Sequence, residues 1–127
     1  MDMEGNELLR VNHLKKYFQT PHGTLSAVDD VTFGINKRET LGVVGESGCG
    51  KSTLGRCILR LHEPTAGEVV FEGKNILACD KKEMKSLRSK MQIIFQDPFS
   101  SLDPRQTVMQ LISEPIIEHK LLKSKSD

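Results

Sequence analysis

The N-terminal part of the chain alternates apolar with polar residues. In residues 31–35, valine, phenylalanine and isoleucine alternate with threonine and glycine, which is the period of a half-buried strand. Residues 8–14 predict an earlier strand, and residues 20–23 have the composition of a turn. Residues 68–72, followed by Gly-Lys, predict a later strand and turn. We expect the first two strands to form an antiparallel layer.

Two short apolar runs have a different pattern, because they lack the polar alternation. They are residues 40–44 (Thr-Leu-Gly-Val-Val) and residues 92–95 (Gln-Ile-Ile-Phe). Continuous runs of this length are typical of buried strands. The sequence therefore predicts an α/β fold in which the antiparallel layer is added to a parallel core.

A different period predicts the helices. Leu54, Cys57, Ile58 and Leu61 have the i, i+3, i+4, i+7 spacing of a helix lying on a sheet, and residues 63–67 should stop that helix. Asp80 with Glu83 is a helix-start signal for a second helix. Asp103-Pro104 or Thr107 begins a third, which Pro115 should kink or restart. The apolar residues expected to face inward in the last two helices are Met84, Leu87, Met91, Val108, Leu111 and Ile112.

Composition limits the function classes. The 127 residues suffice for one domain with a modest core, and 18 basic against 17 acidic residues favour no binding to nucleic acid. There is no apolar run long enough to span a bilayer and no signal-peptide pattern in this sequence. Three cysteines without metal-ligand spacing (Cys49, Cys57 and Cys79) are typical of reduced thiols. We expect a cytoplasmic protein.

Residues 45–53 carry the most specific chemistry. Gly45, Glu46, Ser47, Gly48, Cys49, Gly50, Lys51, Ser52 and Thr53 fit the phosphate-loop pattern G-x-x-x-x-G-K-[ST]. Glycines let the backbone amides approach phosphate oxygens, at the start of a helix whose dipole favours anions. The predicted order of strand, glycine loop and helix is the one that this motif requires.

The loop residues have distinct expected roles toward ATP and Mg²⁺. Lys51 would reach the β- and γ-phosphates, and the Ser52 hydroxyl would bind Mg²⁺. Thr53 is placed to add a hydroxyl to the α-phosphate. The other loop residues would contribute backbone amides.

A second segment makes the sequence resemble a family. Residues 96–105 (Gln-Asp-Pro-Phe-Ser-Ser-Leu-Asp-Pro-Arg), together with residues 45–54, resemble the ATP-binding subunits of ABC transporters, in particular the oligopeptide/dipeptide importer group. The resemblance runs from Leu9 to about Ile117. It implies an ABC-type P-loop NTPase fold with a RecA-like core. Residues 1–127 would be the N-terminal part of one such domain, with the β layer and core over about 1–98 and the start of a helical subdomain over about 99–122.

The resemblance also implies residue roles and partners. Tyr17 matches an aromatic residue that stacks on adenine, a role for which Phe18 competes, and Gln96 matches the Q-loop glutamine that contacts Mg²⁺ or the attacking water. Lys51 and Gln96 would be the catalytic residues in this chain, and Ser52 and Gln96 the metal ligands. Residues 99–105 would dock on membrane permease subunits. A second ATP-binding subunit and a position on the inner face of the cell membrane are implied as well.

The chain departs from the family pattern in several ways. It has Arg38-Glu39 where the family often has Gly-Glu, and Cys49 where serine is commoner. Family members are about twice as long, and their signature motif, second acidic strand and catalytic glutamate have no match in these residues. We therefore expect the isolated chain, truncated before the signature, to bind ATP weakly and to be hydrolytically defective. In the complete subunit, ATP hydrolysis would energise transport of peptides or a related solute.

Two alternatives remain at this stage. Asp97 after residues 93–95 would be the Mg²⁺ ligand of a compact P-loop kinase or GTPase, although Gln96 interrupts the usual pattern of apolar residues followed by aspartate. The chain would otherwise act as a nucleotide-binding or docking module without hydrolysis, since hydrolysis needs a positioned water as well as a phosphate cradle.

Overall fold

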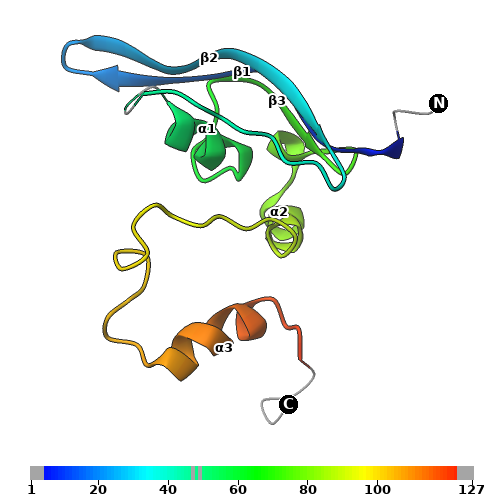
Figure 1. The fold of residues 1–127 in the computed structure, drawn as a ribbon, viewed down its shortest axis with the longest axis vertical. Helices are drawn as coiled ribbons and strands as arrows, with labels where there is room; N and C mark the ends of the chain where they lie inside the picture. The colour runs from blue at the N-terminus through cyan, green and yellow to red at the C-terminus, as the bar shows by residue number, and fades with distance from the viewer. Residues whose placement is uncertain (1–4, 47, 49, 123–127) are drawn as a thin grey trace. The chain divides into compact units, whose positions relative to one another are not determined.

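A four-stranded sheet dominates the first part of the computed structural model, which describes residues 5–46, 48 and 50–122. The long strands β1 (Glu7–Thr20) and β2 (Gly23–Asn36) pair antiparallel, joined by the predicted turn. β3 (Ala66–Phe71) and the short β4 (Lys74–Asn75) extend the sheet, in the order β2-β1-β3-β4 (Figure 1). Every pairing is antiparallel, which confirms the predicted layer.

An α-helix covers part of this sheet. α1 (Lys51–Ile58) contacts β1 and β2 and lies below them in Figure 1. Leu54 and Cys57 of α1 are buried, as their spacing predicts. Each fully buried aliphatic side chain contributes about 1.5–3 kcal/mol. The buried apolar residues of this part are Leu9, Val11, Leu14, Val28, Leu54, Cys57, Val69, Phe71, Ile76 and Cys79.

The described chain divides into two compact units, with the boundary after Asp80. The short 3-10 helix η2 (Ile76–Ala78) ends the first unit. The second contains α2 (Lys81–Arg88) and α3 (Val108–Glu118). Lys85 of α2 and Glu118 of α3 form an ion pair of 2.6 Å within the second unit. No helix in the described part of the chain is long and apolar enough to cross a membrane.

The two predicted core strands are wrong as elements of this structure. Residues 40–44 and 92–95 have no strand conformation, and Val44 and Ile94 are 93% and 96% exposed. A parallel strand needs neighbouring strands and cover on both faces. The four strands of the described residues form one sheet in which every pairing is antiparallel, and neither run pairs with it.

The helix predictions are mostly confirmed. α2 begins directly after Asp80, and Thr107 caps α3 in a capping box with Gln110. α3 nevertheless runs through Pro115 as one helix, and Val108 and Ile112 are exposed where we expected them inward. The described residues of the second unit form only α2 and α3, which leaves few neighbours to cover the apolar face of α3. Leu61 is also exposed, because α1 ends at Ile58 and Arg60 turns the chain with φ 53°.

Candidate nucleotide-binding site

Two glycines of the phosphate loop adopt backbone conformations that only glycine takes easily. Gly48 has φ 80° and Gly50 has φ 99°, both in the left-handed region. Gly50 is the N-cap of α1 and has no side chain to satisfy the first amides, and no acidic residue lies in the first turn. The N–H groups of that turn have no partner inside the helix and carry the positive end of its dipole. This end of α1 therefore suits an anion.

Gly50 also lets the loop lie close to the sheet. A Cβ atom built on Gly50 would lie 2.0 Å from the carbonyl oxygen of Ala27 in β2. Glycine is therefore the one residue type that lets the loop approach β2 this closely. The contact places the start of α1 beside the part of β2 that pairs with Lys16 and Tyr17 of β1.

Lys51 contacts the first residues of the loop. Its ammonium donates hydrogen bonds to the carbonyl oxygens of Gly45 and of Glu46, the latter at 2.7 Å. The structure thus brings together the lysine and the two residues that open the motif. Ser52 is exposed and Thr53 is half-buried in the first turn of α1. Ser47 and Cys49 lie outside the described residues.

The exposed hydroxyl of Ser52 suits a magnesium ion. Mg²⁺ prefers oxygen ligands and usually binds through one or two protein oxygens plus phosphate oxygens. Ser52 offers such an oxygen beside the anion-binding end of α1. No group of three or more His, Cys, Asp or Glu side chains within the described ranges is arranged to hold a metal by itself.

Tyr17 and Phe18 lie on opposite faces of β1, because side chains alternate along a strand. The Tyr17 hydroxyl donates a hydrogen bond of 2.5 Å to Asp29 of β2, and the pKa of Tyr17 is raised chiefly by this bond. Phe18 shares its face with the buried Leu14 and with Lys16. That face is turned toward α1, since Lys16 reaches the segment that follows this helix.

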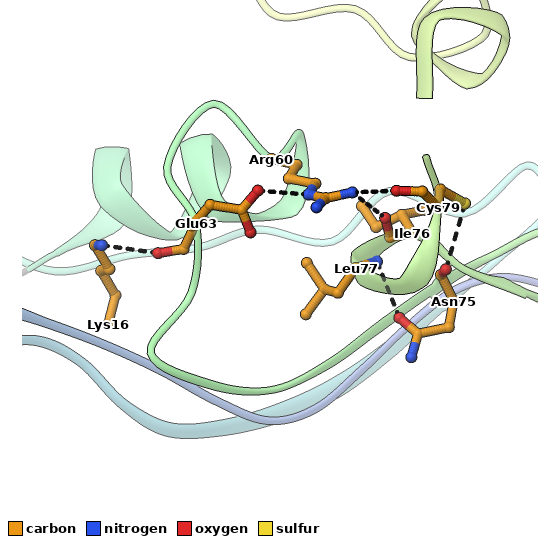
Figure 2. Close-up of polar contacts among 7 residues, drawn as sticks. All are labelled: Lys16, Arg60, Glu63, Asn75, Ile76, Leu77 and Cys79. Carbon is orange, nitrogen blue, oxygen red and sulfur yellow. Dashed lines mark hydrogen bonds and ion pairs between the residues drawn. The ribbon is translucent and has the colours of Figure 1, made fainter. Parts of the chain in front are cut away.

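Residues of β1 and of the segment after α1 surround the Phe18 ring. The Lys16 ammonium lies 4.8 Å from the centroid of the Phe18 ring and donates a hydrogen bond of 2.7 Å to the Glu63 carbonyl. His62 meets the same ring edge to face, with centroids 5.8 Å apart and planes at 86°. Figure 2 shows Lys16 pointing at Glu63 across the space between β1 and the end of α1. These contacts were not predicted, although the two-residue spacing of Leu14, Lys16 and Phe18 is a sequence signal for them.

Arg60 joins the end of α1 to the segment before the unit boundary. Its guanidinium donates to the carbonyl oxygens of Ile76 (3.1 Å) and Cys79 (2.7 Å) and pairs with Glu63 at 2.7 Å (Figure 2). These bonds stabilise the turn in which the Glu63 carbonyl accepts the hydrogen bond from Lys16. No sequence pattern indicated this role for Arg60.

The pKa of Cys57 reflects how α1 is packed. Burial raises the pKa of the Cys57 thiol, and the positive charge of Lys16 partly opposes the rise. A thiol with a raised pKa is a poor nucleophile at neutral pH. Cys57 is therefore a packing residue, and the charge of Lys16 acts on the same side of the sheet.

Gln96 and Asp97 lie in the second unit, in exposed chain without regular structure. The Asp97 carboxylate accepts the backbone N–H groups of Phe99 (3.0 Å) and Ser100 (3.3 Å), which makes it a turn former. The described structure therefore gives Asp97 a local role. The proximity of Gln96 to the phosphate loop remains a prediction.

Comparisons with known proteins give the family. Residues 28–126 match the family model described as ABC transporter. The chain is 54% identical over 122 residues to the oligopeptide transport ATP-binding protein OppF of Bacillus subtilis, covering 95% of this chain and 40% of that protein. It is 45% identical to AppF of the same organism, another oligopeptide transport ATP-binding protein, covering 90% of this chain and 37% of that protein. The chain thus spans well under half the length of these relatives.

Solved structures agree with the family model. A bacterial ABC transporter cassette solved as a dimer has a TM-score of 0.75 and 26% identity, covering 87% of this chain and 47% of that one. A post-hydrolysis ATP-binding cassette bound to ADP and Pi has a TM-score of 0.79 and 25% identity, covering 94% and 51%. The phosphate loop before α1 and the antiparallel layer thus belong to an ATP-binding cassette of P-loop type, and the chain is a member of the ABC transporter family.

Proposed function

We propose that this chain binds ATP through residues 45–53 and that, in the complete subunit, ATP hydrolysis there drives import of peptides. The observation that carries the proposal is the arrangement around Lys51. Its ammonium donates hydrogen bonds to the carbonyls of Gly45 and Glu46. The residue before it, Gly50, lies close to the backbone of β2 at the start of α1. The names of the relatives, oligopeptide transport ATP-binding proteins, support the peptide substrate.

Each residue has a role toward the triphosphate. Lys51 binds the β- and γ-phosphates and stabilises charge that develops during phosphoryl transfer. The hydroxyl of Thr53 binds the α-phosphate. Ser52 and Gln96 bind Mg²⁺, which when present neutralises phosphate charge. The backbone amides contacting the phosphates come from Gly45, Glu46, Ser47, Gly48, Cys49 and Gly50.

For the base we propose Tyr17, the residue predicted from the sequence, with Phe18 as the competing candidate. The hydrogen bond from the Tyr17 hydroxyl to Asp29 is made at the edge of the ring and does not use its flat faces, whereas Phe18 already packs against Lys16 and His62. A flat ring suits a nucleobase, because offset stacking needs no specific hydrogen bonds.

The partners proposed for the complete subunit are membrane permease subunits and a second ATP-binding subunit, at the cytoplasmic face of the membrane. The dimeric cassette structure supports the second of these. No residue of this chain is proposed as the general base. Binding without hydrolysis is therefore the activity we propose for the 127 residues alone.

Parallel measurements test the proposal. Equilibrium dialysis of the purified chain with Mg·ATP should give saturable binding, and phosphate release by the same material should not exceed that of Lys51→Ala. Turnover that Lys51→Ala abolishes would contradict the binding-only assignment. A chain that binds no nucleotide would contradict the proposal as a whole.

A further inference from the structure

Tyr17 is held at both ends by residues outside its own strand. Its hydroxyl donates a hydrogen bond of 2.5 Å to the carboxylate of Asp29 in β2. Its backbone N–H donates to the hydroxyl of Thr65, at 2.9 Å, in the segment between α1 and β3. Two neighbouring segments therefore determine where the ring lies and which way it points.

An irregularity in the pairing of β1 with β2 brings Asp29 to the face of Tyr17. Tyr17 pairs with Ser26, whereas the residue before it pairs with Val28. Ala27 is therefore an extra residue in β2. Side chains alternate along a strand, and an extra residue shifts that alternation by one position. Asp29, three residues from Ser26, consequently shares a face of the sheet with Tyr17.

The same extra residue joins this region to the phosphate loop. The Ala27 carbonyl oxygen is the atom to which a Cβ on Gly50 would come within 2.0 Å. Ala27 lies between Asp29 and the residue that pairs with Tyr17. The hydrogen bond that directs the Tyr17 ring is thus made beside the point at which β2 meets the candidate phosphate site.

The hydrogen bond to Asp29 has a specific effect on the ring. A hydrogen bond from a hydroxyl to a carboxylate is short and stronger than one between neutral groups, and this bond is the chief cause of the raised pKa of Tyr17. It is made at the hydroxyl oxygen, so it fixes the direction of the ring and does not use the flat faces. Tyr17 is half-buried and Asp29 is exposed. A ring that is ordered before binding loses less entropy when a base stacks on it.

We propose that Asp29 is a positioning residue for the base site: it holds the Tyr17 ring in the direction in which a flat face receives the nucleobase. This rests on the proposed function, in which Tyr17 receives the base. Asp29 acts through the Tyr17 hydroxyl and does not touch the ligand. It therefore affects only the part of the affinity that depends on the base.

The test compares two ligands and two aspartates in the full chain. The ligands are Mg·ATP and magnesium tripolyphosphate, which share the phosphates and differ in the nucleoside. Asp29→Ala removes the acceptor. Asp30→Asn is the control, because it removes the same charge one residue further along, and asparagine tolerates the φ of 53° at that position.

Calorimetric titrations measure the two affinities. We expect Asp29→Ala to weaken Mg·ATP about two- to tenfold, the range for ordering one side chain on binding. The affinity for tripolyphosphate should stay unchanged. Asp30→Asn should leave both affinities as they were.

Two further variants show whether Asp29 acts through the hydroxyl. Asp29→Asn keeps an oxygen that accepts from Tyr17 and should restore most of the Mg·ATP affinity. Tyr17→Phe keeps the ring and should lose as much affinity as Asp29→Ala. Adding Asp29→Ala to Tyr17→Phe should then cause no further loss. If Asp29→Ala fails to fold, which circular dichroism reveals, Tyr17→Phe breaks the same hydrogen bond from the other side.

Tyrosine fluorescence reports on the ring directly, since Tyr17 is the one tyrosine in a chain without tryptophan. A base that stacks on the ring should change its emission when Mg·ATP binds, and tripolyphosphate should leave the emission unchanged. In Asp29→Ala the same change should need about two- to tenfold more Mg·ATP.

The outcomes distinguish this inference from the function on which it rests. Equal weakening of both ligands by Asp29→Ala, or the same loss in Asp30→Asn, would overturn the positioning role. If Tyr17→Leu weakens Mg·ATP while Asp29→Ala and Tyr17→Phe do not, the base platform stands and the role of Asp29 is refuted. If neither ligand binds the parent chain, or if binding ignores Lys51→Ala, the proposed function itself fails.

Discussion

Gly50 and Ala27 lie backbone against backbone, so that a Cβ atom on Gly50 would come 2.0 Å from the Ala27 carbonyl oxygen. This relationship joins the phosphate loop to β2. Gly50→Ala must move the loop and also strain a residue at φ 99°, at a cost of about 1–2 kcal/mol for the conformation alone. We expect at least about tenfold weaker binding of Mg·ATP, measured by calorimetric titration.

Gly55 provides the matched control for that change. It lies inside α1, and a Cβ atom there would meet nothing within 4 Å. Gly55→Ala should stabilise the protein by about 0.5–1 kcal/mol through the helix propensity of alanine, without loss of nucleotide affinity. Equal losses in the two variants would show that the Gly50–Ala27 approach has no special part in binding.

The Arg60 contacts at the end of α1 predict a stability effect. Arg60→Gly should destabilise the fold by about 1–3 kcal/mol, because the carbonyls of Ile76 and Cys79 lose a charged donor. Arg38 controls for the backbone, since it also has a positive φ, of 64°. Arg38→Gly should be neutral or stabilising. Urea denaturation curves measure both, and a stable Arg60→Gly variant would contradict the importance of this contact set.

Tyr17 predicts a pH effect that can be read directly, because it is the one tyrosine in a chain without tryptophan. Its pKa is raised from 10.0 chiefly by the hydrogen bond to Asp29. The stabilisation from this bond is therefore complete below about pH 10 and is lost as the pH rises through the folded-state pKa. An ultraviolet titration of the phenolate should show the raised pKa in the parent and a value closer to 10.0 in Asp29→Asn. Identical curves would refute the contact.

The ion pair of Lys85 and Glu118 predicts an effect of low pH on the stability of the second unit. The hydrogen bond from Lys85 lowers the pKa of Glu118 from 4.5. The contribution of this pair to α2–α3 packing is therefore present above pH 4.5 and is lost as the pH falls through the lower, folded-state pKa. In a nuclear magnetic resonance titration, Lys85→Met should raise the pKa of Glu118. Lys82→Met, a change on the same helix, should not. A pKa of Glu118 that ignores Lys85→Met would contradict the pair.

Local patterns predicted the elements that depend on local physics. The alternation in residues 31–35 and the spacing of Leu54 and Cys57 correctly predicted β2 and α1, because each pattern matches the period of its own element. The capping box at Thr107 was also readable, since its hydrogen bonds join neighbours in sequence. The positions of the phosphate-loop glycines were also predictable, because the motif that contains them is one continuous run of residues.

The remaining features depend on partners that a local pattern does not contain. The apolar run at residues 40–44 has the composition of a buried strand, yet it forms one only when other strands flank it. The hydrogen bond from Tyr17 to Asp29 depends on how β1 pairs with β2, and the carbonyls that accept from Arg60 lie 16 and 19 positions further along the chain. Periodicity carries no information about such contacts.

A calorimetric titration with Mg·ATP compares the parent chain, Lys51→Ala and Lys37→Ala, and so tests whether the phosphate loop binds the nucleotide. Lys37 is an exposed lysine in the turn after β2, outside the loop. We expect saturable binding by the parent and by Lys37→Ala, and none by Lys51→Ala at the same concentrations. Equal binding by all three folded proteins, or no binding by any, would contradict it.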